Sequence, residues 1–76
     1  MARVKTTKIA AEMVANILEI PVAVGDRIEV GETVALLESM KMEIPVLAEQ
    51  AGVVTEVVAQ AGDVVQEGDV LVVVEG

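Results

Sequence analysis

The sequence repeats itself at a spacing of 37 residues, and this repeat limits the possible folds more than any other feature. Both copies contain the pattern Gly-Asp-x-[Ile/Val]-x-x-Gly-[Asp/Glu], followed by an apolar segment. The matching turn pairs are Gly25-Asp26 with Gly62-Asp63, and Gly31-Glu32 with Gly68-Asp69. A repeat of this length indicates one supersecondary unit used twice, over residues 11–38 and 48–75. We therefore expect two similar halves related by an approximate two-fold axis.

The repeat also decides between helix and strand near the N-terminus. Apolar residues between positions 9 and 18 recur at helical spacing, and taken alone they predict a helix over Ala10–Leu18. The copy of this segment contains Val53–Val58, which is rich in β-branched residues and predicts a strand. If the halves share a fold, Ala11–Val22 is extended too. The chain then has about eight short strands separated by glycine turns, which is typical of a sandwich or flattened barrel.

A tight hairpin is predicted where the two units meet. Thr33–Glu38 and Met42–Leu47 both alternate with a period of two, as strands do. Met40-Lys41 sits between them, and the connection is short enough to be a tight hairpin. Pro45 favours an edge position or a bulge for the second strand. The second unit ends at Glu75-Gly76, so this hairpin is the prominent feature that the repeat does not duplicate.

Composition excludes several classes of function. The 76 residues include no cysteine and no histidine, which argues against zinc, iron–sulfur and haem sites and against thiol or imidazole catalysis. The acidic residues of the glycine turns lack EF-hand spacing and are interpreted as turn residues rather than calcium ligands. A Ser39–Lys41 dyad would lack an enclosed substrate pocket in so small a domain. We therefore predict a protein that is not itself an enzyme and has no metal site.

Charge and segment composition suggest where the protein acts. The formal net charge of −8 argues against binding nucleic acid or an anionic membrane, and favours a monomer. The absence of cysteine, of a signal peptide and of a long apolar segment predicts a cytoplasmic protein. Residues 1–8 hold three of the five basic residues and are predicted to form a flexible lead-in, with the domain over residues 9–76.

Lys41 is the last basic residue of the chain and stands between two methionines. One interpretation is an ordinary solvated turn lysine, which is common at strand edges. The other is a covalent attachment site, which needs an exposed amine on a rigid base without competing amines nearby. Methionine usually fills cores, as we expect of Met13. Met40 is better explained by recognition, whereas Met42 fits either role.

The segment Glu-Ser-Met-Lys-Met-Glu at residues 38–43 resembles the biotinylation motif of biotin carboxyl carrier domains. With the glycine turns and the repeat, the chain resembles the biotinyl/lipoyl attachment family over residues 9–76, and most closely its small free-standing biotinylated members. The resemblance implies a flattened barrel of two four-stranded antiparallel sheets (a barrel-sandwich hybrid) with the lysine on an exposed hairpin. It implies covalent biotin on Lys41, with Met40 and Met42 as the flanking recognition residues. The remaining hairpin neighbours are Glu38, Ser39 and Glu43.

The same resemblance implies partners and alternatives. A biotin protein ligase would attach the biotin, and biotin carboxylase and carboxyltransferase components of an acyl-CoA type carboxylase would load and unload it as carboxybiotin. Related lipoyl domains usually carry Asp-Lys-Ala at this hairpin, so Met-Lys-Met favours biotin, with a lipoyl carrier or dual acceptor as the alternative. The first half is too short for the thumb loop of some carriers, and no Pro/Ala-rich linker precedes residue 9. We therefore expect a free carrier; an unmodified interaction module is the remaining alternative.

Overall fold

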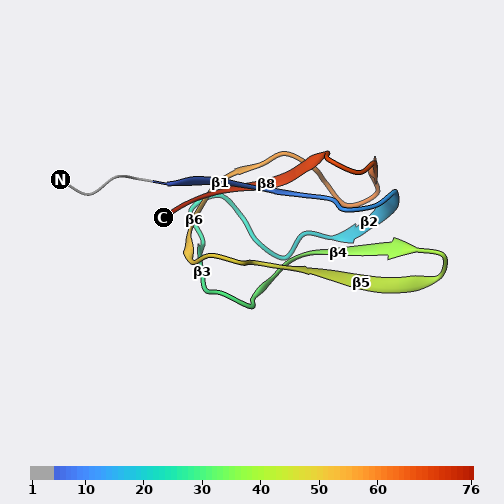
Figure 1. Ribbon diagram of the computed structural model, residues 1–76, viewed down its shortest axis with the longest axis horizontal. Coiled ribbons are helices and arrows are strands. Elements are labelled where there is room, and N and C mark those ends of the chain that lie inside the picture. The colour runs from blue at the N-terminus through green and yellow to red at the C-terminus, as the bar shows by residue number, and fades with distance from the viewer. Residues whose placement is uncertain (1–4) are drawn as a thin grey trace.

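The structure is a computed structural model that describes residues 5–76 (Figure 1). Within that range every regular element is a β-strand. The strands are β1 (Thr6–Ala10), β2 (Ala15–Glu19), β3 (Arg27–Ile28), β4 (Thr33–Ser39), β5 (Met42–Leu47), β6 (Gly52–Val57), β7 (Val64–Val65) and β8 (Val70–Glu75). They form two antiparallel four-stranded sheets, ordered β1-β8-β6-β3 and β5-β4-β2-β7. The predicted all-β sandwich is therefore confirmed, as is strand rather than helix around residue 17.

Each copy of the repeat contributes two strands to each sheet. Strands β1 to β4 recur as β5 to β8 at the offset of 37 residues, and β3 and β7 match residue for residue. The first sheet takes β1 and β3 from one half and β8 and β6 from the other; the second sheet does the reverse. Each half is thus split over both sheets, so neither half has a core of its own.

The turns of each half bind strands of the other half. The amide of Gly25 donates to the carbonyl of Val54, and the amide of Val54 donates to the carbonyl of Asp26, both at 2.8 Å. The equivalent bond of the other half runs from Gly62 N to Ile17 O at 2.8 Å. Gly25 and Gly62 adopt φ of 96° and 94°, a region that favours glycine. The repeated Gly-Asp turns therefore connect the two halves through backbone hydrogen bonds.

The acidic residue after each turn glycine reaches back over its own turn. The Asp26 carboxylate accepts from the amide of Ala23 at 2.8 Å, and the Asp63 carboxylate from that of Gln60 at 2.9 Å. The turns ending at Glu32 and Asp69 repeat this bond at 3.0 and 2.9 Å. Each carboxylate accepts from the backbone N–H three residues before it and so closes its own turn. The interpretation of these residues as turn residues is confirmed.

The domain begins earlier than residue 9. Thr6, Thr7 and Lys8 belong to β1 and pair with β8, and Lys5 exchanges two backbone hydrogen bonds with Gly76. The predicted lead-in was wrong for these positions because β1 is an edge strand and its polar residues give no apolar alternation. The rest of the predicted lead-in, residues 1–4, lies outside the described residues.

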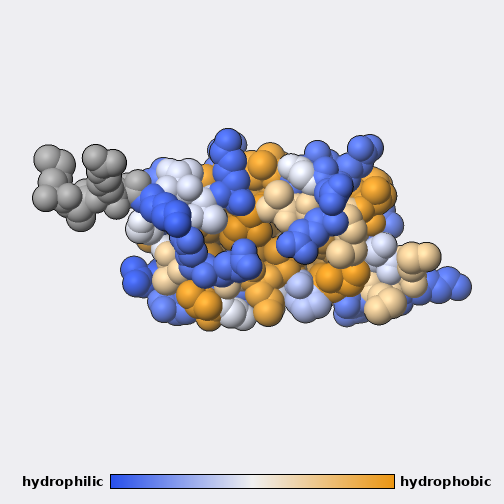
Figure 2. Space-filling model, in the orientation of Figure 1, coloured by the Kyte–Doolittle hydropathy of each residue, from blue (hydrophilic) through white to orange (hydrophobic). Residues whose placement is uncertain are grey.

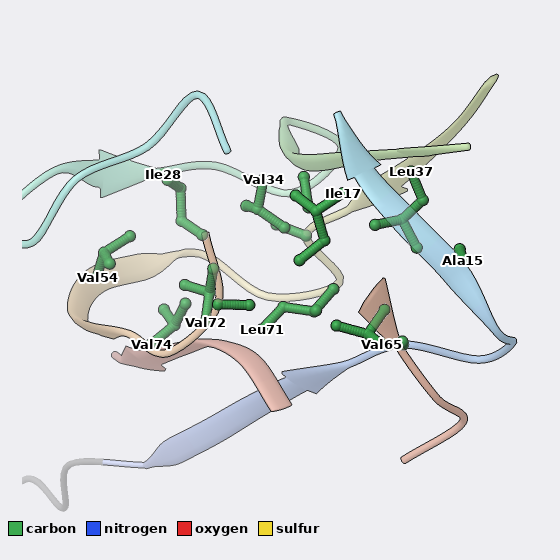
Figure 3. Close-up of a cluster of buried hydrophobic side chains, with 14 residues drawn as sticks. Ala15, Ile17, Ile28, Val34, Leu37, Val54, Val65, Leu71, Val72 and Val74 are labelled. Carbon is green, nitrogen blue, oxygen red and sulfur yellow. The ribbon is translucent and has the colours of Figure 1, made fainter. Parts of the chain in front are cut away.

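The core lies between the sheets and is purely aliphatic (Figure 3). Its largest fully buried side chains are Ile17, Ile28, Val34, Leu37, Val54, Leu71 and Val72. No polar side chain among residues 5–76 is buried. The same part of the chain has no helix long and apolar enough to cross a membrane.

Candidate functional site

The hairpin between β4 and β5 closes in the shortest possible way. Ser39 and Met42 are its last paired residues, and only Met40 and Lys41 form the turn. Their φ angles are 53° and 65°. Positive φ at both central residues is the mark of a type I′ turn, which normally uses Asn-Gly because other side chains are disfavoured there. Two bulky side chains therefore occupy a turn that local preference would give to small residues.

The turn side chains project into solvent. Met40 is 92% exposed and Met42 is 65% exposed, while Lys41 is also exposed. Within residues 5–76 one ion pair is present, Arg27 with Glu29 at 3.3 Å, so the Lys41 amine has no carboxylate partner there. Neither methionine adds to the core. The prediction that at least one of them is exposed is confirmed, and Met42 is not a core residue.

A rigid base supports the turn. Strand β4 pairs with β5 on one side and β2 on the other, and Leu37, which is 1% exposed, pairs with both Ile44 and Ile17. Pro45 lies on β5, an edge strand, as predicted. The hairpin projects at the opposite end of the molecule from the start of β1 and the C-terminus (Figure 1). The pair that closes the hairpin, Ser39 with Met42, corresponds in the repeat to Gly76 with Lys5. The second copy of the repeat therefore has no turn at this position.

Sequence reasoning did not foresee how the hairpin glutamates are arranged. Glu38 and Glu43 lie directly opposite each other on one face. Like charges in this position are unfavourable, so the pair is not explained by stability. Across the sheet, Glu38 also pairs with Asn16 on β2, and Asn16 pairs with Val64 on β7, which is 68% exposed. No local pattern could have linked Val64 to the motif, because only the strand register joins them.

All six residues predicted for the site come together at this hairpin. Glu38 and Ser39 end β4, Met40 and Lys41 form the turn, and Met42 and Glu43 begin β5. An acyl donor needs an exposed primary amine, and that of Lys41 has no ion pair among the described residues 5–76. Exposed apolar thioethers lie on both sides of it in the sequence. The residues present therefore fit an acyl group carried in amide linkage.

The family model that matches this chain and two of its relatives carry biotin in their names. The family model described as "Biotin-requiring enzyme" matches residues 2–74. A biotinylated protein TB7.3 homolog of Mycobacterium leprae is 53% identical, covering 87% of this chain and 93% of its own. A biotin/lipoyl attachment protein of Bacillus subtilis is 51% identical, covering 83% and 86%.

Solved structures show the same fold within much larger proteins. The urea carboxylase of Kluyveromyces lactis matches with a TM-score of 0.85 and 31% identity over 92% of this chain. A single-chain, multi-domain long-chain acyl-CoA carboxylase also gives 0.85, with 28% identity over 90%. This chain spans only 6% and 7% of those two proteins. On these matches, this chain belongs to the biotin/lipoyl attachment domain family.

Proposed function

We propose that this protein is a biotin carrier, with biotin attached through an amide to the Nζ atom of Lys41. The observation that carries the proposal is the exposed Met40-Lys41 turn on a hairpin fixed by its neighbouring strands. Met40 and Met42 flank the amine as recognition residues, and Glu38, Ser39 and Glu43 complete the surface that a ligase would contact. A cytoplasmic location and a monomeric state remain predictions from the sequence.

The attachment reaction requires little of this chain beyond presenting the amine. A biotin protein ligase would supply biotinyl-adenylate as the acyl donor. Nζ forms the amide bond to the acyl carbon, the bond from that carbon to AMP breaks, and the amine loses a proton. The chain contributes position: the amine lies on the hairpin at one end of the molecule (Figure 1), where an enzyme cleft can enclose it, and it forms no ion pair with residues 5–76. No catalytic residue of this chain is needed.

The attached group would serve carboxyl transfer. Biotin accepts a carboxyl group at one active site and releases it at another. The solved structures with this fold are multi-domain carboxylases, and a biotin-dependent acyl-CoA carboxylase subunit of Mycobacterium leprae is 36% identical over 83% of this chain. We propose that separate biotin carboxylase and carboxyltransferase components provide the two active sites. This domain would then carry the carboxyl group from one to the other.

Lipoate is the second candidate for the attached group. One relative carries the name biotin/lipoyl attachment protein, and its chain is matched over 86% of its length. Lipoate is also joined to a lysine amine through an amide, so an exposed amine on this hairpin suits it. The methionines on both sides of Lys41, in place of the Asp-Lys-Ala of lipoyl domains, favour biotin.

Intact-mass spectrometry after co-expression with a biotin ligase tests the proposal. We expect one biotinyl group per chain, no label on Lys41→Arg, and full labelling of the matched control Lys8→Arg on β1. Unlabelled wild-type protein would contradict the proposal and favour an unmodified interaction module. Label retained on Lys41→Arg would move the site to another amine. A parallel culture with a lipoyl ligase shows whether lipoate is accepted as well.

A further inference from the structure

A groove of about 790 Å³ runs between the edge strands β1 and β5, one from each sheet. Its apolar lining includes Ile9, Met13, Leu37, Ile44 and Val46. Four of these are only partly buried and pack on the edge of the core. Hydrophobic surface is visible between hydrophilic residues on the face shown in Figure 2. The sandwich is therefore incompletely closed along this side.

The groove begins next to the hairpin. Its first paired residues are Leu37 and Ile44, and the next pair on the same face is Ser39 with Met42 at the base of the turn. Met42, Ile44 and Val46 alternate along β5 and so share that face. Because Met42 is 65% exposed, apolar surface continues from the groove to the residue after Lys41.

Although Glu12 lines the groove beside Met13, the end of the groove far from the hairpin holds most of its polar side chains. There the Thr7 hydroxyl lies 3.1 Å from the side-chain oxygen of Gln50 and donates to it, joining β1 to the segment after β5. Lys8 and Glu49 also line the groove. An apolar occupant would therefore be accommodated at the hairpin end.

A biotinyl-lysine arm has the length and chemistry for that end. About eleven bonds separate the lysine Cα from the biotin ring, so the extended arm spans about 14 Å. Ile44 lies three residues beyond Lys41, or about 10 Å along the strand, whereas Gln50 would be about 30 Å away. The arm is a run of methylenes ending in a ring with a sulfur-containing apolar edge. Met13, whose thioether adapts to irregular shapes, also lines the groove and belongs to the connection between β1 and β2, which lies toward the hairpin end of the molecule (Figure 1).

We infer that the hairpin end of this groove is a resting site for the biotinyl arm, formed by Met13, Met42 and Ile44. The inference rests on the proposed attachment at Lys41. The site is open to solvent at Met42, which suits an arm that must leave to reach a partner. Contact with the groove would keep the ring near the carrier between transfers.

Methyl NMR of the full chain, with and without biotin, tests the inference. We expect shift changes at the Met13 and Ile44 methyl groups, and NOEs from them to the methylenes of the arm. Val24, which is 64% exposed in the turn before β3, should be unchanged. Met13→Gln should keep the apo spectrum folded and lower the intensity of the Ile44 NOEs by at least half, whereas the control Val58→Gln should not.

The outcomes separate this inference from the proposed function. Failure to biotinylate, seen by mass, would contradict the proposed function. Biotinylated protein whose changes stop at the two methionines flanking Lys41 would overturn the resting site alone. Changes at Ile44 that grow with protein concentration would also overturn it, because a second copy would then occupy the groove.

Discussion

Replacing the turn residues by Asn-Gly should make this protein more stable while removing its attachment site. Met40 and Lys41 have φ of 53° and 65°, and neither side chain is buried, so no packing is lost on replacement. A residue with a Cβ in the left-handed region costs about 1–2 kcal/mol. Asparagine tolerates that region and glycine has no penalty there, so Met40→Asn with Lys41→Gly relieves a cost at both positions.

The expected gain can be estimated from these terms. Relief at two positions contributes about 2–3 kcal/mol, and the added freedom of glycine in the unfolded chain removes about 0.4–1 kcal/mol. The net increase in the free energy of unfolding is then about 1.5 kcal/mol. For a domain of this size, that corresponds to a rise in Tm of about 6–12 °C.

Thermal and urea unfolding followed by circular dichroism measure the effect. The single variants Met40→Asn and Lys41→Gly should each give part of the gain, and only variants lacking Lys41 should lose the label in the ligase assay. Val24→Gly is the matched control: Val24 is exposed in a turn but has no positive φ, so glycine there should lower stability by about 0.5–1 kcal/mol. A double variant with unchanged or lower Tm would refute the idea that the turn is held at a conformational cost.

Three further perturbations test the fold. Gly52→Ala should destabilise strongly, by about 2–3 kcal/mol in urea unfolding, because a Cβ there would lie 2.5 Å from the Glu75 carbonyl oxygen. Ile17→Ala should cost about 2–4 kcal/mol in the same assay, since the side chain is 2% exposed and leaves a cavity. A circular permutant that joins Gly76 to Lys5 through Asn-Gly and opens the chain within the hairpin should fold with a native circular dichroism spectrum, because these residues already exchange two backbone hydrogen bonds.

Each of these has a contrary outcome. Gly52→Ala with wild-type stability would mean that β6 and β8 separate easily at that point. A small effect of Ile17→Ala, similar to that of the exposed control Val14→Ala, would mean that the core collapses around the gap. An unfolded permutant would show that the hairpin connection, and not only the pairing, is needed to bring the two halves together.

The sequence by itself determined the internal repeat, the strand character of most segments and the position of the candidate lysine. Glycine turns and β-branched runs are local signals, and the repeat let a clear strand at Val53–Val58 correct an ambiguous one near Ile17. The composition of the hairpin motif was likewise readable without any fold. These features depend on residues that are neighbours in the chain, which is why the sequence carries them.

Only the tertiary structure decided how the halves are combined and what surrounds the lysine. The exchange of strands between sheets, the start of β1 at Thr6 and the facing of Glu38 and Glu43 depend on strand register. The pairing that brings Val64 into line with Glu38 and the groove lined by Met13 depend on register as well. Register is set when distant apolar faces are buried together, and no short stretch of sequence specifies it alone.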